Sequence, residues 1–192
     1  MKTEVVVLLL LAIVVALVML MPKGNAGVSM QDARNFVLED MKTKYPNAEI
    51  TEVISSKEEN GAYKIKGRVS SALSSPCPQR LHLYYDYPVS HFVTWVENIT
   101  RNCKVCEGLP ECVIAFEEEA VAASHTYAGS ERVGAYLVKY PDAKASYELL
   151  SEFEGETDVW HVTWEGAYAA VKMNVYLSKN KNSILWVREE GK

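Results

Sequence analysis

Four cysteines are the residues of this chain whose type and spacing could support chemistry. Cys103-Lys104-Val105-Cys106 forms a Cys-x-x-Cys pair, Cys112 follows the pair by six residues, and Cys77 precedes it by twenty-six. Four thiolates could hold zinc tetrahedrally, but such sites normally use two Cys-x-x-Cys pairs and this chain has one. A redox dithiol at Cys103 and Cys106 would need the pair at a helix start, where the helix dipole lowers the pKa of a thiol, and no such start signal surrounds it.

Structural disulfides are the interpretation that the four cysteines favour. Their number is even, all lie between Cys77 and Cys112, and an even set in an exported chain typically forms disulfides. Of the three possible connectivities we prefer Cys77 with Cys103 and Cys106 with Cys112, because this choice pins a strand to the loop and closes the loop on itself. Zinc binding or thiol redox chemistry at Cys103 and Cys106 remains the alternative.

The remaining polar residues show no catalytic spacing. His82, His91, His125 and His161 are scattered over a strand, a loop, a helix end and a second strand. The chain has no Gly-x-Ser-x-Gly, His-Glu-x-x-His or glycine-rich phosphate motif. The acidic triplet Glu117-Glu118-Glu119 is expected on the solvated side of a helix. We therefore expect a protein that is not an enzyme and that has no metal or other cofactor.

Aromatic residues gather in the C-terminal part of the chain and could form a binding surface. They are Trp160, Trp164, Tyr168, Tyr176 and Trp186. A sheet covered by one helix leaves its second face free, and Trp160, Trp164 and Tyr176 on that face would offer a platform to a partner. The alternative, which we prefer, is that these aromatic side chains fill the core beneath the helix.

An apolar segment near the N-terminus indicates where the chain works. Val5 to Met21 is a run of seventeen apolar residues without a charge, and Pro22-Lys23-Gly24 follows it. As a helix this run spans roughly 25 Å, close to the hydrocarbon thickness of a bilayer. We expect residues 1–23 to form a single-pass membrane anchor, with the domain outside the cytoplasm. Secretion after cleavage near Ala26 is the alternative, because Gly24-Asn25-Ala26 offers the small residues of a signal peptidase site.

Charge limits the partners of the exported part. The net charge of −5 resides entirely beyond the apolar segment, because Lys2 and Glu4 cancel each other. An acidic domain is not expected to bind nucleic acid or an anionic lipid surface. The lipid bilayer is therefore expected as a partner only through Val5 to Met21. Asn98-Ile99-Thr100 matches the N-glycosylation acceptor pattern, which would fit an external loop.

Hydrophobic periodicity predicts helices and strands along the rest of the chain. Ser29 and Asp32 have the spacing of a capping box at the start of a helix that ends before Pro46. Strands are predicted over residues 48–53, 63–69, 80–87, 145–153, 158–165, 169–177 and 184–187, and further helices over residues 113–125 and 130–140. Lys64, Lys66 and Arg68 alternate with apolar residues and are expected on a solvated sheet face. Periodicity is lost from residue 88 to residue 112.

A short repeat divides the chain into two units. Lys44-Tyr45-Pro46-Asn47-Ala48 recurs as Lys139-Tyr140-Pro141-Asp142-Ala143, each time between an amphipathic helix and a strand. We therefore predict a first unit over residues 24–87, a Cys-rich insert with a helix over 88–128, and a second unit over 129–192. Each unit is expected to contain a helix, a hairpin and further strands.

These motifs resemble the PepSY family. The resemblance is carried by Tyr45-Pro46-Asn47-Ala48-Glu49-Ile50 and by Glu58-Glu59-Asn60-Gly61-Ala62-Tyr63-Lys64-Ile65, within a match of about forty residues, 29–69. Residues 130–187 look like a more diverged copy. The resemblance implies a cystatin-like fold in each unit, with a helix across a curled antiparallel sheet, and an extracytoplasmic location. It also implies a role in restraining peptidases or binding envelope partners, and it supplies no catalytic residue.

The sequence thus predicts an α+β fold, in which a transmembrane helix precedes two helix-on-antiparallel-sheet units with a Cys-rich insert. The leading functional hypothesis is a membrane-anchored extracytoplasmic binding or inhibitory module without catalytic activity, whose partner is an unknown envelope protein or peptidase. The alternative is a thiol-redox or zinc-binding protein that uses Cys103 and Cys106. A third hypothesis is a structural surface component whose strand edges pair with copies of itself.

Overall fold

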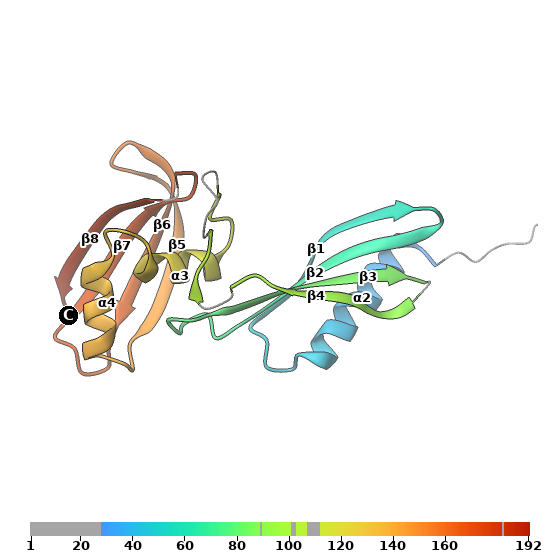
Figure 1. Ribbon diagram of the computed structural model, residues 1–192, viewed down its shortest axis with the longest axis horizontal. Helices are drawn as coiled ribbons and strands as arrows, with labels where there is room; N and C mark the ends of the chain where they lie inside the picture. The colour runs from blue at the N-terminus through green and yellow to red at the C-terminus, as the bar shows by residue number, and fades with distance from the viewer. Residues whose placement is uncertain (1–27, 89, 101–102, 107–111, 182) are drawn as a thin grey trace, which may run out of the picture.

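The computed structural model describes residues 28–88, 90–100, 103–106, 112–181 and 183–192. The described residues form an α+β fold of two four-stranded antiparallel sheets and three helices. The first sheet has the strands β1 (Ile50–Glu59), β2 (Ala62–Ser71), β3 (Gln79–Tyr87) and β4 (Ser90–Asn98) in sequential order. The second has β5 (Lys144–Phe153), β6 (Glu156–Glu165), β7 (Val171–Ser178) and β8 (Ser183–Gly191), also in sequential order. Figure 1 shows the two sheets at opposite ends of an elongated molecule.

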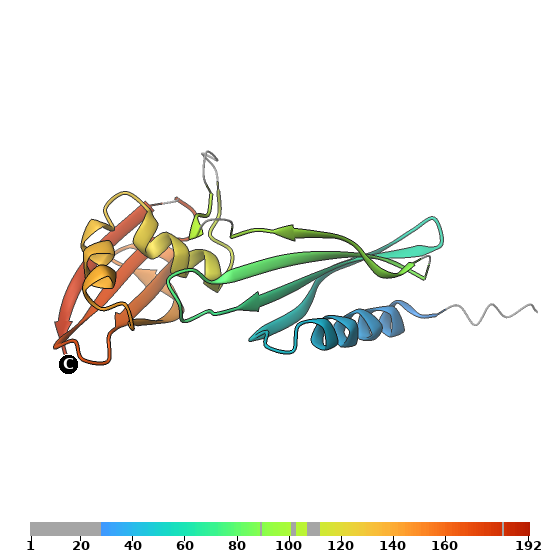
Figure 2. The ribbon, with the colours of Figure 1, turned by 60° about the horizontal axis from the view of Figure 1, so that its bottom comes forward.

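Helix α2 (Met30–Lys44) covers one face of the first sheet, as Figure 2 shows. The predicted capping box is present: Ser29 Oγ accepts a hydrogen bond from Asp32 N at 3.1 Å, and the Asp32 carboxylate accepts one from Ser29 N at 3.2 Å. These bonds satisfy amides that the first helical turn leaves free. Ala33, Val37 and Met41 on one stripe of the helix are fully buried and form a core with the sheet.

Gly67 in β2 allows the helix to approach the sheet closely. A Cβ atom at this position would lie 2.2 Å from Met41 Sδ and 2.8 Å from Met41 Cε. The apolar residues on both sides of the glycine, Ile65 and Val69, are buried in the same core as Leu83 of β3. The absence of a side chain at Gly67 therefore makes room for the end of the methionine.

Strand β4 lies where the sequence showed no periodicity. It pairs antiparallel with β3, so the first sheet continues beyond residue 87, where we had placed the end of the first unit. Two register shifts, at Tyr84/Tyr85 and Tyr85/Asp86, disturb the pairing. Because β4 is an edge strand, Trp95 and Val96 are both exposed and no apolar alternation marks the strand.

Two helices, α3 (Glu117–Thr126) and α4 (Glu131–Lys139), pack with the second sheet. The core contains the fully buried Trp164, whose Nε1 donates to Ser124 Oγ of α3 at 2.9 Å. Helix α3 starts later than the predicted residue 113. The reason is that Ile114 N donates to Lys179 O at 2.9 Å, which keeps the preceding backbone extended.

Both units contain the same helix-to-strand turn, which confirms the repeated arrangement. Tyr45 ends α2 with φ −126° and ψ 64°, and Tyr140 ends α4 with φ −125° and ψ 78°. The amide two residues past each proline, Ala48 N and Ala143 N, donates to the tyrosine carbonyl at 3.0 Å in both copies. The first hairpin of each unit also turns through two residues with positive φ, of which the second is glycine.

The spacing between the copies changes by one residue inside the first strand. The helix-to-strand turns are 95 residues apart, whereas the glycines of the hairpin turns, Gly61 and Gly155, are 94 apart. The pairing of β1 with β2 shifts register between Val53 and Ser55, as expected for a β-bulge. The bulge therefore accommodates the extra residue of the first unit.

Two disulfides hold the segment between the sheets, with the connectivity that we preferred. Cys77, between β2 and β3, is joined to Cys103, and Cys106 is joined to Cys112. The first bond therefore ties the β2–β3 connection to the chain that follows β4.

The predicted anchor, Val5 to Met21, and the possible cleavage site near Ala26 lie outside the described residues. In the part of the chain that the structure describes, no helix is both long enough and apolar enough to cross a bilayer.

Candidate functional site

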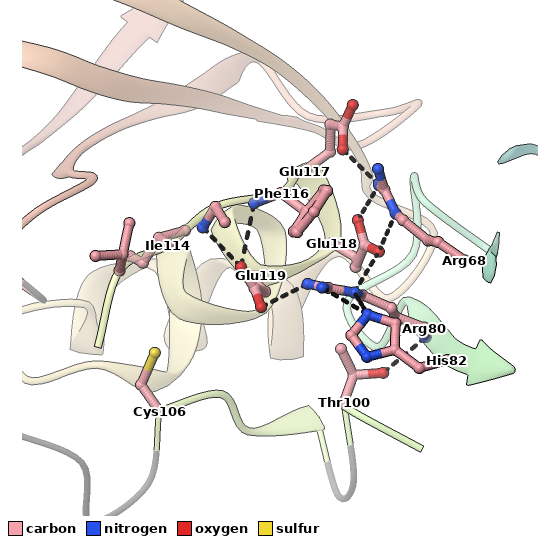
Figure 3. A network of polar contacts seen from close by, with 12 residues as sticks. Arg68, Arg80, His82, Thr100, Cys106, Ile114, Phe116, Glu117, Glu118 and Glu119 are labelled. Atoms are coloured by element: carbon pink, nitrogen blue, oxygen red, sulfur yellow. Dashed lines mark hydrogen bonds and ion pairs between the residues drawn. The ribbon is translucent and has the colours of Figure 1, made fainter. Parts of the chain in front are cut away.

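The acidic triplet at the start of α3 is buried against the first sheet, so the prediction of a solvated acidic face was wrong. Glu118 has 0% of its surface exposed and Glu119 is also buried. Figure 3 shows the carboxylates directed at two arginines that project from the first sheet. The face of each sheet that lies away from its own helices is called the outer face here. The N-terminal end of α3 therefore covers one end of the outer face of the first sheet.

Arg68 in β2 is the centre of this junction. Its Nη2 and Nε donate to the two oxygens of Glu118 at 2.6 and 3.0 Å, and Nη2 also donates to Glu117 at 2.6 Å. Nη1 donates to Glu52 of β1 at 2.8 Å, and Ser70 Oγ donates to Glu118 at 2.7 Å. Burial opposes the charge of the guanidinium, but the bonds to Glu118 and Glu117 outweigh this effect and raise the pKa of Arg68. Arg68 was expected on a solvated face, but it is buried and donates hydrogen bonds to three carboxylates.

Arg80 in β3 makes the second half of the junction. Its Nη1 donates to Glu119 at 2.6 Å, and its Nε donates to His82 Nε2 at 3.1 Å. Burial raises the pKa of Glu119 and is opposed by Arg80 and by hydrogen bonds from Ala115 N and Phe116 N. Burial and the neighbouring Arg80 lower the pKa of His82 to about 4. His82 is therefore neutral at physiological pH and can accept the arginine hydrogen bond.

Phe116 places an aromatic ring between the two cations. Its ring centroid lies 4.3 Å from Arg68 Cζ and 3.9 Å from Arg80 Cζ. A ring face attracts a guanidinium, and the contact also excludes water from the ion pairs. The junction thus combines Phe116, which directly precedes α3, and the first three acids of α3 with two arginines on the first sheet, and each of the three acids has an arginine partner. We interpret it as a structural connection between the units, because its charged groups pair with one another.

The cysteines have no free thiol. In the described residues all four sulfurs are in disulfides, and the Cys-x-x-Cys pair is divided between two bonds. Thiolates are the species that bind zinc and attack disulfides, so Cys103 and Cys106 cannot do either in this oxidised state. No group of three or more His, Cys, Asp or Glu residues in the described ranges is placed to hold a metal ion.

The histidines are as scattered in space as in the sequence. His82 lies in the junction, and His125 Nε2 lies 2.5 Å from Pro76 O near the end of α3. His161 lies on the outer face of the second sheet, and the structure does not describe the side chain of His91. These positions offer no shared site.

His161 has neighbours that match a carboxylate, imidazole and hydroxyl triad in type. Glu148 Oε1 lies 2.9 Å from its Nδ1, and Thr163 Oγ1 lies 3.2 Å from its Nε2. The hydroxyl hydrogen of Thr163, however, is donated to Asn174 Oδ1 at 2.8 Å, and Nε2 lies 3.0 Å from the same oxygen. Since Thr163 does not donate to the imidazole, the arrangement does not activate a nucleophile. It is a hydrogen-bond network on the sheet surface.

The predicted aromatic platform is divided between the core and the surface. Trp160 and Trp164 are buried, and Trp160 Nε1 donates to Ile114 O at 2.8 Å, so these two residues do not form a binding surface. Tyr176 lies on the outer face, where its ring stacks on His161 with the centroids 4.4 Å apart. Trp186 lies opposite Tyr176 on β8 and is exposed. The preferred core interpretation therefore holds for Trp160 and Trp164 only.

An equivalent aromatic pair occurs in the first sheet, and sequence reasoning missed it. Tyr84 of β3 lies opposite Trp95 of β4 with ring centroids 5.0 Å apart, as Tyr176 of β7 lies opposite Trp186 of β8 at 6.4 Å. In both units the tyrosine is on the third strand and the tryptophan on the fourth. Trp95 is 58% exposed and Trp186 is 46% exposed. Alternation within β3 places Tyr84 away from the core, but the match to Trp95 depends on β4, which the sequence did not reveal.

The two pairs have different neighbours on the adjacent strand. In the first sheet Lys66 of β2 lies opposite Tyr84, with its Nζ 5.3 Å from the ring centroid. In the second sheet His161 of β6 occupies the corresponding place beside Tyr176. The first pair thus borders a lysine and the second an imidazole.

The glycosylation pattern falls at the end of β4. Asn98 is exposed, whereas Thr100 is buried and its Oγ1 accepts a hydrogen bond from Arg80 N at 3.0 Å. Glycosylation of Asn98 stays a prediction.

Comparisons of the chain with family models, with curated proteins and with solved structures found no match.

Proposed function

We propose that this chain is an extracytoplasmic binding module that holds a protein partner on the outer faces of its sheets and catalyses no reaction. The observation that carries the proposal is the recurrence of a half-buried tyrosine beside an exposed tryptophan, Tyr84 with Trp95 and Tyr176 with Trp186. Tyrosine and tryptophan are enriched at protein interfaces and often dominate binding energy there. The two core tryptophans are buried between α3 and the second sheet, whereas these pairs recur at matching strand positions outside both cores.

The junction supports a binding role because it connects the two units firmly. Arg68 and Arg80 of the first sheet are paired with Glu118 and Glu119 of α3, which packs on the second sheet. A partner with two contact points gains affinity when those points are held at a fixed spacing. The buried ion pairs are therefore suited to keep the two aromatic pairs at a constant separation.

The proposed location rests on the apolar run Val5 to Met21 and on the disulfides. Two disulfides are characteristic of an oxidising compartment outside the cytoplasm. We propose a single-pass membrane anchor, with secretion after cleavage near Ala26 as the alternative. The PepSY resemblance adds the partner class, an envelope protein or a peptidase that the module restrains. The arrangement of a helix on an antiparallel sheet in both units supports a cystatin-like fold for that resemblance.

Site-specific photo-crosslinking in the native membrane tests this function. A photoreactive phenylalanine analogue replaces Trp95 or Trp186 in the full chain, and Tyr168 serves as the matched control because it is an aromatic residue that is 94% exposed but lies outside the strands. We expect both sheet positions to crosslink to the same heterologous protein and position 168 not to do so. Equal yields at the three positions would contradict the proposal. Crosslinks only to a second copy would support the structural surface component instead.

A further inference from the structure

A hollow of about 350 Å³ lies on the outer face of the first sheet, beside Tyr84. Its walls come from all four strands and include Ser55, Lys64, Lys66, Asp86 and Thr94. Its volume falls within the range of sites that hold a small ligand or a peptide side chain. The hollow and the aromatic pair thus form one continuous surface.

The hollow is lined by three lysines. Lys57 pairs with Glu59 at 3.1 Å on the exposed hairpin, and Lys64 forms an ion pair with Asp86. No ion pair joins Lys66 to a carboxylate within the described residues, and the contact of its Nζ is with the ring of Tyr84. Lys66 is therefore available to an anionic group that enters from outside.

Asp86 adds an unused acceptor to the same wall. Its Oδ2 engages Lys64, but its Oδ1 is buried and has no hydrogen-bond partner in the described structure. A buried carboxylate oxygen without a donor is unfavourable and is normally satisfied. A peptide N–H in the hollow would supply the donor once the Asp86 side chain turns this oxygen toward the hollow.

The outer face of the first sheet already contacts a segment of the chain, the start of α3, at the outward residue pair next to the hollow. Arg68 lies opposite His82, and the next outward pair along the same two strands is Lys66 opposite Tyr84. At the first position Phe116 lies against the arginine and the acids of α3 neutralise it. The hollow is thus continuous with a contact made by an acidic segment that carries an aromatic residue.

We propose that the hollow binds an acidic, aromatic-containing polypeptide segment of the partner protein. In this complex a carboxylate of the partner pairs with Lys66, a backbone N–H donates to Asp86 Oδ1, and an aromatic ring packs on Tyr84 and Trp95. The inference rests on the proposed binding function and specifies the chemistry of one of its two contact points. The net charge of −5 does not prevent the contact, because charges beyond about 8 Å are largely screened at physiological salt.

A peptide with the sequence of the chain's own α3 start tests the proposal. The probe is fluorescein-labelled Val-Ile-Ala-Phe-Glu-Glu-Glu, and its matched control has three glutamines in place of the glutamates. Fluorescence anisotropy is measured with the full chain in detergent, up to millimolar protein. We expect saturable binding of the acidic peptide and at least about tenfold weaker binding of the glutamine peptide, since charge-assisted contacts are lost.

Variants of the protein locate the binding. Lys66→Glu should weaken binding of the acidic peptide at least about tenfold by replacing attraction with repulsion, and Trp95→Ala should also weaken it. Tyr168→Ala is the matched control, because it removes an aromatic side chain that is 94% exposed and lies outside the strands, and it should leave binding unchanged. An unchanged unfolding transition for Lys66→Glu shows that the fold is intact.

The two proposals fail in different ways. Equal binding of the two peptides, no effect of Lys66→Glu, or no saturable binding overturns the assignment of the hollow to an acidic segment. If crosslinking from positions 95 and 186 still captures one heterologous protein, the binding function stands without that assignment. If the peptide does not bind as expected and positions 95 and 186 do not crosslink to one heterologous protein, the binding function itself is refuted.

Discussion

Replacing Glu118 by glutamine should destabilise the protein more than any comparable change of a surface acid. Glutamine keeps the shape of the side chain but removes the charge that faces Arg68 at 2.6 Å and Arg80 at 3.6 Å. Both guanidiniums are buried, so water cannot replace the lost carboxylate. Removing one member of a buried ion pair typically costs about 3–5 kcal/mol.

This loss is large compared with the stability of either unit. A unit of roughly 70 residues has a free energy of unfolding of roughly 4–10 kcal/mol, from about 0.05–0.15 kcal/mol per residue. Because Glu118 joins two sheets with separate cores, its replacement should also weaken their coupling. We expect the single urea transition of the wild-type chain to shift to lower denaturant and to separate into two.

Fluorescence of the core tryptophans follows the unfolding of the second unit, and circular dichroism follows both units. Glu117→Gln is the matched control, because Glu117 pairs with Arg68 alone and is partly exposed. It should cost no more than about 1 kcal/mol, as an exposed ion pair does. If Glu118→Gln costs as little as Glu117→Gln, the junction does not stabilise the fold and our interpretation of it is wrong.

Three further changes test other parts of the structure. The pKa of His82 is lowered to about 4, so the unfolded chain binds a proton at higher pH than the native protein does. The free energy of unfolding should therefore be highest above about pH 6.5 and should fall by up to about 3 kcal/mol as the pH drops toward 4. Urea unfolding of His82→Gln should lack this decrease. Replacing Cys77 and Cys103 by serine opens a loop with a sequence separation of 26 and should lower the free energy of unfolding by about 3.5 kcal/mol, whereas an unchanged urea midpoint would contradict the tie between the strand connection and the insert. Gly67→Ala should cost about 1–3 kcal/mol by displacing Met41, and Gly67→Ala combined with Met41→Ala should recover part of the effect of the glycine change.

Local sequence signals predicted much of the fold. The capping box of α2 depends on Ser29 and Asp32, which are three residues apart, and the repeated helix-to-strand turn depends on five consecutive residues. Each of these two features is determined by neighbours in the chain, so the sequence contains the information directly. The preferred disulfide connectivity was also confirmed, although it was one of three that the sequence left open and Cys77 pairs with Cys103 across a separation of 26.

The burial of the acidic triplet could not be predicted in the same way. Glu118 has its partner Arg68 fifty residues earlier in the chain and in the other unit. Three consecutive glutamates on a helix ordinarily face water, and nothing nearby in the sequence indicates an arginine partner. Two clues were present without being combined: Arg68 and Arg80 both occur within predicted strands of one sheet, and Phe116 directly precedes the acids. Only the packing of the units brings these groups together.

The same limit explains why the aromatic pairs were predicted only in part. Tyr176 was recognised as a candidate surface residue, but Tyr84 and Trp95 were not, because β4 has no apolar alternation. The likeness of the two pairs depends on the register of β3 with β4 and of β7 with β8, and the first of these could not be predicted without recognising β4 as a strand.

The junction also imposes an order on how the chain reaches its final form. Ribosomes release the N-terminal half first, and α2 with β1 to β4 contains a complete core of its own. Arg68 and Arg80 must stay hydrated during that interval, because Glu118 and Glu119 leave the ribosome later. The acidic helix start can pair with these arginines only after it too has been synthesised, and this pairing joins the two separate cores.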